Sequence, residues 1–356
     1  MKSSSRRKEI SKKVENGENG HYNVSKNSAP SYFMTLALVF GGCCSNAWSL
    51  ERLLMHDSNI GSALTFLQLS FVMLYYLPSV LHFPQDVAYT RWFPRLDTRV
   101  VPLQLWSLQV IVLLGVNIFN NWTFIYKIPL TLQIIFRSSG LAVSMIFGYL
   151  FLDKRYNRQQ ILAVIMVSCG VCIATLSRPT SRTSMQDDYD PVAYVKGIFV
   201  MALSLILSGI LGTLQEKTFR QYGSFVWKEG LFYTHALALP CLLMISRDIP
   251  SGLKSLSSHG VSTRKSIPEI YVVVFMNVIT QACCISGVNR LGSTVSSVQT
   301  NLLLTARKAA SLVISILLLG SGWNVGLMVG AVLVSAGTIL YSWRRNSPVN
   351  DAKKDL

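Results

Sequence analysis

Apolar residues in this chain come in long runs that short polar stretches separate. Each run holds about 18 to 24 residues, enough to cross the roughly 30 Å hydrocarbon core of a bilayer as an α-helix. The pattern predicts ten membrane-spanning helices, at residues 32–50, 60–81, 101–122, 129–152, 159–177, 194–215, 229–246, 269–288, 295–319 and 323–343. We therefore expect an all-α membrane protein.

Composition supports a membrane protein and excludes an ordinary soluble domain. Half of the 356 residues are hydrophobic, and 14% are charged, where soluble proteins carry about a quarter. Residues 1–31 are polar and basic and predict a disordered cytosolic tail without a cleavable signal peptide. The net charge of +16 fits basic residues that orient a membrane protein better than it fits a nucleic-acid partner, and we expect no nucleic acid.

The positions of the basic residues predict the orientation. With the N-terminus in the cytosol, the tails and cytosolic loops contain 21 of the 33 Lys and Arg residues. This asymmetry follows the positive-inside rule, and an even number of spans puts residues 344–356 in the cytosol as a second tail. The stretches 82–100, 178–193 and 247–268 read as loops, so any chemistry must lie among the helices.

The seven cysteines all lie in apolar segments. Two pairs are adjacent in sequence, a spacing poorly suited to a disulfide within the pair. Cys169 and Cys172 form a C-x-x-C inside a predicted helix with no histidine nearby. We assign Cys169 and Cys172 to packing rather than to redox or zinc chemistry.

Weak internal similarity indicates two related halves. Residues 135–148 align with 304–317, and 167–175 with 334–342, at small and apolar positions. Each half, 32–177 and 194–343 around a luminal linker at 178–193, has five spans. Because five is odd, the copies must insert with opposite topology. Such inverted repeats place a substrate site near the membrane midplane, although a repeat can also be purely architectural.

Three basic residues lie deep inside predicted spans: Arg137, Arg307 and Lys308. A cation at the bilayer centre costs about 2.5–3.5 kcal/mol on insertion scales. No Asp or Glu lies deep in any predicted span, since Glu51 and Glu216 fall at span ends. The pattern favours an anionic substrate as their partner over snorkelling to the membrane surface.

Several uncharged polar residues accompany these cations inside the predicted spans. They are Gln133 on the fourth span, Asn117 and Asn121 on the third, and Asn277 and Gln281 on the eighth. We take these five as candidate substrate contacts, with helix–helix hydrogen bonding as the equal alternative.

Longer motifs in the chain resemble a known family. IPLTLQIIFRSSGL (128–141), KEGLFYTHALALP (228–240), NVITQACCISGV (277–288) and LLLTARKAASLVISILL (302–318) are four of these. They resemble nucleotide-sugar transporters of the drug/metabolite transporter superfamily, in the branch with fungal UDP-N-acetylglucosamine and animal UDP-xylose/UDP-N-acetylglucosamine transporters. The resemblance covers roughly residues 34–343.

The resemblance implies ten helices and exchange of a cytosolic nucleotide sugar for a luminal nucleoside monophosphate. We expect UDP-N-acetylglucosamine to exchange for UMP, with UDP-xylose or another UDP-sugar as the alternative. The resemblance also implies that Arg137, Arg307 and Lys308 hold the phosphates, and Tyr233 and His235 are candidate base or sugar contacts.

Two other classes are less favoured by the residues. A membrane-embedded glycosyltransferase needs a carboxylate or metal cluster, and the five histidines are scattered without a catalytic constellation. An exporter of amines would need buried carboxylates for its cationic substrate. We expect no enzyme activity, no cofactor and no metal.

The C-terminal residues predict an address. Lys353 and Lys354 stand four and three places from the end of the chain, as in dilysine signals that vesicle coats read on cytosolic tails. Such a signal is an address, not an anchor. It predicts residence in the endoplasmic reticulum membrane, with cycling to the Golgi.

Overall fold

The computed structural model describes residues 29–56, 60–82, 95–96, 99–126, 136–137, 139–177, 191–246, 248–260, 269–319 and 325–343. Within these ranges the chain is almost wholly helical, as the apolar runs predict. Some predicted features lie outside the described residues. These are Gln133, residues 1–28 of the N-terminal tail, and the whole C-terminal tail with Lys353 and Lys354.

The helices follow one another along the chain with few other elements between them. They are α2 (Ala29–Ala37), the π-helical turn η2 (Leu38–Gly42), α3 (Cys43–His56), α4 (Gly61–Tyr76), the 3₁₀ turn η4 (Leu77–Ser79), α5 (Leu103–Ile125), α7 (Gly140–Leu152), α8 (Arg158–Leu176), α9 (Pro191–Tyr222), the 3₁₀ turn η5 (Ser224–Val226), α10 (Trp227–Ile245), α11 (Ile249–Gly260), α12 (Glu269–Thr294), α13 (Ser297–Leu319) and α14 (Val325–Trp343). Two short strands, β1 (Leu81–His82) and β2 (Arg95–Leu96), pair antiparallel in the stretch between α4 and α5.

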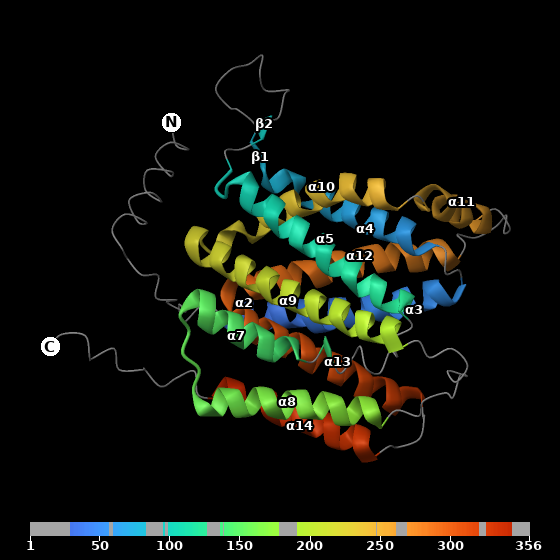
Figure 1. The fold of residues 1–356 in the computed structure, drawn as a ribbon. Helices are drawn as coiled ribbons and strands as arrows, with labels where there is room; N and C mark the ends of the chain where they lie inside the picture. The colour runs from blue at the N-terminus through green and yellow to red at the C-terminus, as the bar shows by residue number, and fades with distance from the viewer. Residues whose placement is uncertain are drawn as a thin grey trace.

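The long helices lie side by side in a bundle (Figure 1). The connection between α7 and α8 and the turn between α9 and α10 lie at the same end of this bundle, the left end in Figure 1. Helices α8 and α14 form a pair along one edge. They approach closely because Gly170 and Gly337 lie at their contact, where a Cβ at Gly337 would stand 2.9 Å from the carbonyl oxygen of Ala163.

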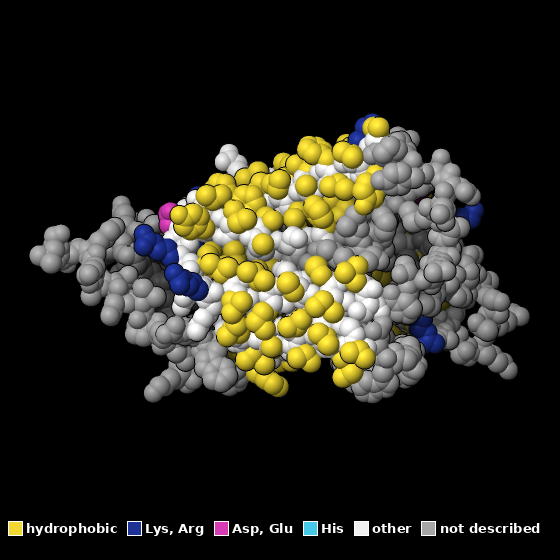
Figure 2. Space-filling model, turned by 60° about the horizontal axis from the view of Figure 1, so that its bottom comes forward, with side chains coloured by type: hydrophobic (Ala, Val, Ile, Leu, Met, Phe, Trp, Pro, Cys, Tyr) yellow, Lys and Arg dark blue, Asp and Glu magenta, His cyan; other side chains and the backbone are white. Residues whose placement is uncertain are grey.

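The outer surface of the bundle suits a lipid environment. Figure 2 shows hydrophobic side chains across the middle of one face, with Lys and Arg side chains towards its two ends. Large apolar side chains such as Phe199, Phe275 and Val325 are more than 60% exposed. Exposure on this scale is typical of a surface that faces acyl chains rather than water.

Five described helical segments are long and apolar enough to cross a membrane. A sixth is counted if α10 and α11, which are bent by 96° relative to one another, form one broken span. The segments α7, Arg158–Ala174 and Met328–Tyr341 are apolar but shorter. The multi-helix membrane class is therefore supported, while ten spans and their inverted arrangement stay predictions.

Two helices continue past the ends of the spans predicted for them. The span predicted to end at residue 215 continues as α9 to Tyr222, and the one predicted to end at 288 continues as α12 to Thr294. Phe219 and Leu291, in these extensions, are 5% and 0% exposed. Hydropathy locates where a helix enters water, but tertiary packing lets the helix itself continue.

The stretch 247–268, predicted as a loop, contains the helix α11. Ile249 and Leu256, seven residues apart on one face, are buried, and Leu256 packs in a cluster with Leu53, Ile60 and Val278. An amphipathic helix of this length is too polar for a membrane-span pattern but has the apolar stripe of a surface helix.

Cys169 and Cys172 are free thiols, but two of the other cysteines form a disulfide that the sequence did not predict. Cys43, at the start of α3, forms a disulfide with Cys284 of α12, with Cα atoms 4.5 Å apart. The backbones meet closely there, since a Cβ on Gly42 would lie 2.8 Å from the amide nitrogen of Cys284. One partner comes from each of the two adjacent cysteine pairs. Because the partners are 241 residues apart in sequence, local cysteine spacing could not predict this disulfide.

Candidate functional site

A cavity of about 240 Å³ lies inside the bundle between α5, α7, α9 and α13. Its polar lining residues are Asn120, Thr123, Arg137, Ser204, Ser208, Asn301, Thr305, Arg307 and Lys308. Small-molecule sites commonly measure about 300–1,000 Å³, so this cavity is small for a drug-sized ligand. The helices around it come from both predicted halves of the chain.

Helix α13 supplies one wall through its helical period. Asn301, Thr305 and Lys308 are spaced four and three residues apart, so they share one face and all line the cavity. Thr305 donates to the carbonyl oxygen of Asn301 at 2.8 Å. This bond leaves the hydroxyl satisfied within the helix, as is common for threonine in apolar surroundings.

The opposite wall is formed by α5 and α9. Ser204 donates to Asn120 Oδ1 at 3.0 Å, and Thr123 donates to the carbonyl oxygen of Asn120 at 2.6 Å. Ser204 and Ser208 lie one helical turn apart on α9 and both line the cavity. These serines are not among the site residues predicted from the sequence, although two hydroxyls spaced by four in an apolar span are a readable signal.

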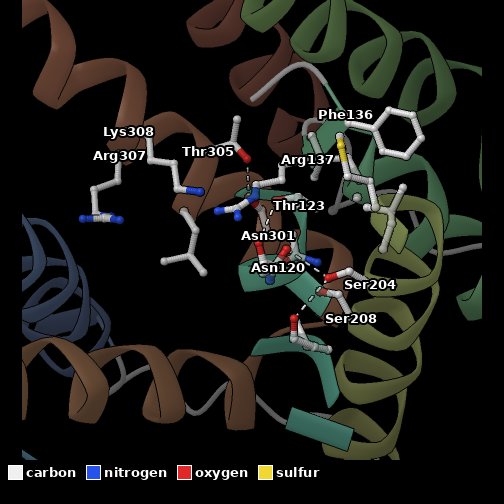
Figure 3. A pocket seen from close by; sticks show the side chains of 16 residues that line it. Asn120, Thr123, Phe136, Arg137, Ser204, Ser208, Asn301, Thr305, Arg307 and Lys308 are labelled. Carbon is white, nitrogen blue, oxygen red and sulfur yellow. Dashed lines mark hydrogen bonds between the residues drawn. The ribbon is translucent and has the colours of Figure 1, made fainter. Parts of the chain in front are cut away.

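The three predicted cations all line this cavity. In Figure 3 the Lys308 ammonium points toward the Arg137 guanidinium, whereas the Arg307 guanidinium points away from Arg137. The Nε of Arg307 is buried and has no hydrogen-bond partner in the described part of the chain. Arg137 and Lys308 have exposed side chains, and two cations that point toward one another repel, which makes the cavity attractive to an anion.

The cations have no acidic neighbour in ion-pair contact among the described residues. One described salt bridge joins a lysine to a glutamate, and it pairs Lys154 with Glu216, away from the cavity lining. Glu216, which follows the predicted span 194–215 by one residue, lies within α9 and is 7% exposed. Its carboxylate is nevertheless committed to other partners.

Asn277 and Gln281 lie in a second polar cluster, which we call the amide network and which joins α3, α4 and α12. Gln68 donates to Asn277 Oδ1 at 2.6 Å, and Asn277 Nδ2 donates to Ser49 Oγ at 2.9 Å and to the carbonyl oxygen of Asn46 at 3.2 Å. Asn46 Nδ2 donates to Gln281 Oε1 at 2.7 Å. None of these five residues lines the cavity described above.

The remaining predicted contacts lie elsewhere or outside the described residues. Tyr233 and His235 lie on α10 and are 9% and 6% exposed, with His235 Nδ1 2.7 Å from the carbonyl oxygen of Leu231. Asn117 is exposed on α5 and does not line the cavity. Asn121 lies in α5 with its side chain outside the description, as is all of Gln133.

Comparison with known proteins gives a consistent family. The chain is 32% identical to the UDP-N-acetylglucosamine transporter of Schizosaccharomyces pombe, over 90% of this chain and 98% of that protein. It is 32% identical to the UDP-xylose and UDP-N-acetylglucosamine transporter of Danio rerio, over 86% and 92%. It is 30% identical to the endoplasmic reticulum GDP-fucose transporter of Drosophila melanogaster, over 86% and 89%.

The family model supports the same assignment. Residues 31–345, which contain every described helix except the first two residues of α2, match the UAA transporter family. The match spans both halves and includes all three cavity cations. The resemblance noted in the sequence is confirmed, and the chain belongs to the UAA transporter family, a family of transporters rather than enzymes.

Proposed function

We propose that this protein exchanges cytosolic UDP-N-acetylglucosamine for luminal UMP across the membrane of the endoplasmic reticulum. The observation that carries the proposal is the convergence of Lys308 and Arg137 in one intramembrane cavity without a carboxylate in ion-pair contact among the described residues. A diphosphate brings the negative charge that this cavity lacks. We take UDP-N-acetylglucosamine as the nucleotide sugar because it is the substrate in the name of the S. pombe relative.

The clamp on the phosphates combines two kinds of cation. Arg137 offers the planar fork of a guanidinium, which can bind two phosphate oxygens at once, while Lys308 contributes a compact charge. Arg307 points away from Arg137, but it also lines the cavity, and its buried Nε has no hydrogen-bond partner among the described residues, so we include it in the set. Asn277, Gln281, Tyr233 and His235 stand outside this clamp, and contact of these residues with substrate stays a prediction.

Obligatory exchange follows from the charges. An empty carrier keeps Arg137 and Lys308 close together without an anion between them, and closing the helices around them raises their repulsion. A bound phosphate removes that penalty, so the loaded carrier changes conformation faster than the empty one. UMP, with one phosphate, is the anion that binds to these cations when the carrier returns from the lumen to the cytosol.

The architecture we propose has ten spans in two inverted five-helix repeats, 32–177 and 194–343, joined by 178–193 in the lumen. Both tails, 1–31 and 344–356, then lie in the cytosol. The end of the bundle that carries the α7–α8 connection is the cytosolic end. Lys353 and Lys354 would be read there by the vesicle coat, in keeping with the endoplasmic reticulum in the name of the D. melanogaster relative.

Exchange in liposomes tests the function. The purified protein, reconstituted in liposomes loaded with labelled UMP, should release the label when UDP-N-acetylglucosamine is added outside and should leave the sugar nucleotide unaltered. Liposomes without protein are the control. If neither UDP-N-acetylglucosamine, UDP-xylose nor UDP-glucose drives release above that control, the proposal fails.

UDP-xylose is the second candidate, since the D. rerio relative is named for both sugars. Competition separates the two. At equal concentrations, the preferred donor should suppress uptake of the other into UMP-loaded liposomes more strongly than the reverse.

A further inference from the structure

Polar and apolar contacts join α7 to α13 beside the cavity. Asn301 Nδ2 donates to Ser144 Oγ at 2.7 Å, and this bond joins α13 to α7. Asn301 lies seven residues before Lys308, which places the bond about 10 Å from the lysine along the helix axis. Leu141, Val298 and Leu302 pack at the same level and are 1–2% exposed.

Glu216 makes a second set of contacts beyond that bond. Its Oε1 pairs with the Lys154 ammonium, and its Oε2 accepts a hydrogen bond from the backbone N–H of Ser297 at 2.9 Å. Ser297 is the first residue of α13, so the carboxylate sits at the positive end of that helix. One buried side chain of α9 thus ties the start of α13 to the connection after α7.

The connection after α7 is shaped to reach Glu216. Asp153 ends the helix in a left-handed conformation with φ 50°, and Lys154 then donates its N–H to the carbonyl oxygen of Gly148 at 3.1 Å. Tyr156 lies over Gly148, where a Cβ would clash with the tyrosine hydroxyl. These contacts keep the turn packed against the end of α7, where Lys154 can reach Glu216 of α9.

The pKa of Lys154 is lowered overall, and burial is the largest cause. Burial lowers the pKa of Lys154, while the neighbouring Glu216 carboxylate raises it and Arg220 opposes that effect. Burial also raises the pKa of Tyr156 to about 12, so the phenol stays neutral beside the pair. When the ion pair separates, each charge needs water, which means that separation and opening of this end to water occur together.

We infer that Glu216 is a positioning residue for transport: it holds the cytosolic end of the cavity closed, and its release from Lys154 and Ser297 accompanies opening to the cytosol. The inference rests on the proposed function, which supplies the orientation and the need for an opening. It extends that function because Glu216 does not line the cavity and acts through α13, the helix that carries Arg307 and Lys308.

Cysteine accessibility tests the closure without any nucleotide. Ser208 lines the cavity, and Ser208→Cys offers a thiol there for a membrane-impermeant maleimide applied from the cytosolic side of microsomes. Glu216→Gln, added to this chain, should raise the labelling rate about tenfold, since it removes one charge-assisted contact. Lys154→Gln should raise the labelling rate to a similar extent. Because it changes no residue of α9 or α13, it tests the same contact if Glu216→Gln fails to fold.

Matched variants separate closure from a general charge effect. Arg155→Gln removes the same charge one residue away, from an exposed side chain, and should leave labelling unchanged. The exchange Lys154→Glu with Glu216→Lys should label more slowly than Glu216→Lys alone, because the pair is restored in reverse. Equal labelling of Glu216→Gln, Lys154→Gln and the parent, or no rescue by the exchange, overturns the inference. A failed UDP-sugar exchange assay does not affect this measurement.

Discussion

The cation cavity and the amide network are both polar regions between apolar helices, but they differ in where their partners come from. In the network, both protons of Asn277 Nδ2 and its Oδ1 are bonded within the protein, and Asn46 Oδ1 is the one buried polar atom of the five described side chains that lacks a partner. In the cavity, Arg137, Arg307 and Lys308 have no ion-pair partner among the described residues.

This difference separates two uses of intramembrane polarity. A satisfied amide stabilises a helix contact, because leaving it unpaired in an apolar interior costs more than pairing it. An unpaired cation destabilises the protein by itself and persists where it has a ligand to bind. The two regions therefore predict opposite responses to removal of their polar groups.

The largest effect is expected at Arg137. Arg137→Gln should lower the affinity for UMP about 10- to 100-fold, since a charge-assisted hydrogen bond contributes about 1.5–3 kcal/mol. The melting temperature in detergent should stay the same or rise, because an unpaired charge is gone. Arg137→Lys, which keeps the charge without the fork, should bind with intermediate affinity.

Lys308→Gln is the matched variant from α13 and should show the same combination of weak binding and unchanged stability. Binding is measured by microscale thermophoresis and stability by thermal unfolding of the same preparation. Unaltered UMP affinity in both glutamine variants would place the anion site elsewhere in the molecule.

A large effect of the opposite kind is expected in the amide network. Asn277→Leu removes the partner of Gln68 and Ser49 at a position that is 0% exposed. Each orphaned group costs about 1–3 kcal/mol, so unfolding should shift to clearly lower temperature. UMP affinity of the protein that remains folded should equal that of the parent, and a selective loss of affinity at unchanged stability would instead assign Asn277 to the substrate.

The sequence could predict the helices and the cations because both signals are local. Apolar runs mark spans, and a basic residue inside a run is visible without knowing the fold. It could not predict which polar groups meet, because that depends on helix pairing: Asn46 and Gln281, for example, are 235 residues apart. The same limit concealed the Cys43–Cys284 disulfide and the commitment of Glu216 to Lys154.

A smaller effect is expected at the edge of the network. Gln281→Leu leaves Asn46 Nδ2 without its partner, while the bonds of Asn277 remain. The loss of one bond at a half-buried position should lower the free energy of unfolding by about 1 kcal/mol. A chemical-denaturation series should place this variant between the parent and Asn277→Leu. A decrease as large as that of Asn277→Leu would mean that the network acts as one cooperative unit.

The smallest effect is expected at Asn117, which tests the boundary between the two regions. The sequence predicted Asn117 as a substrate contact, but its side chain is exposed and lines neither the cavity nor the amide network. It lies on α5 one residue after Val116, about 100° around the helix, and three before Asn120, about 60° around it, so it points to one side of the wall that these two residues form. Asn117→Leu should change the free energy of unfolding by less than about 0.5 kcal/mol and leave UMP exchange unaltered.

Asn120→Leu, one turn along the same helix, is the comparison: it removes the acceptor of Ser204 inside the cavity and should slow exchange. If Asn117→Leu slows exchange as much as Asn120→Leu does, the substrate reaches beyond the cavity wall and the predicted contact is restored.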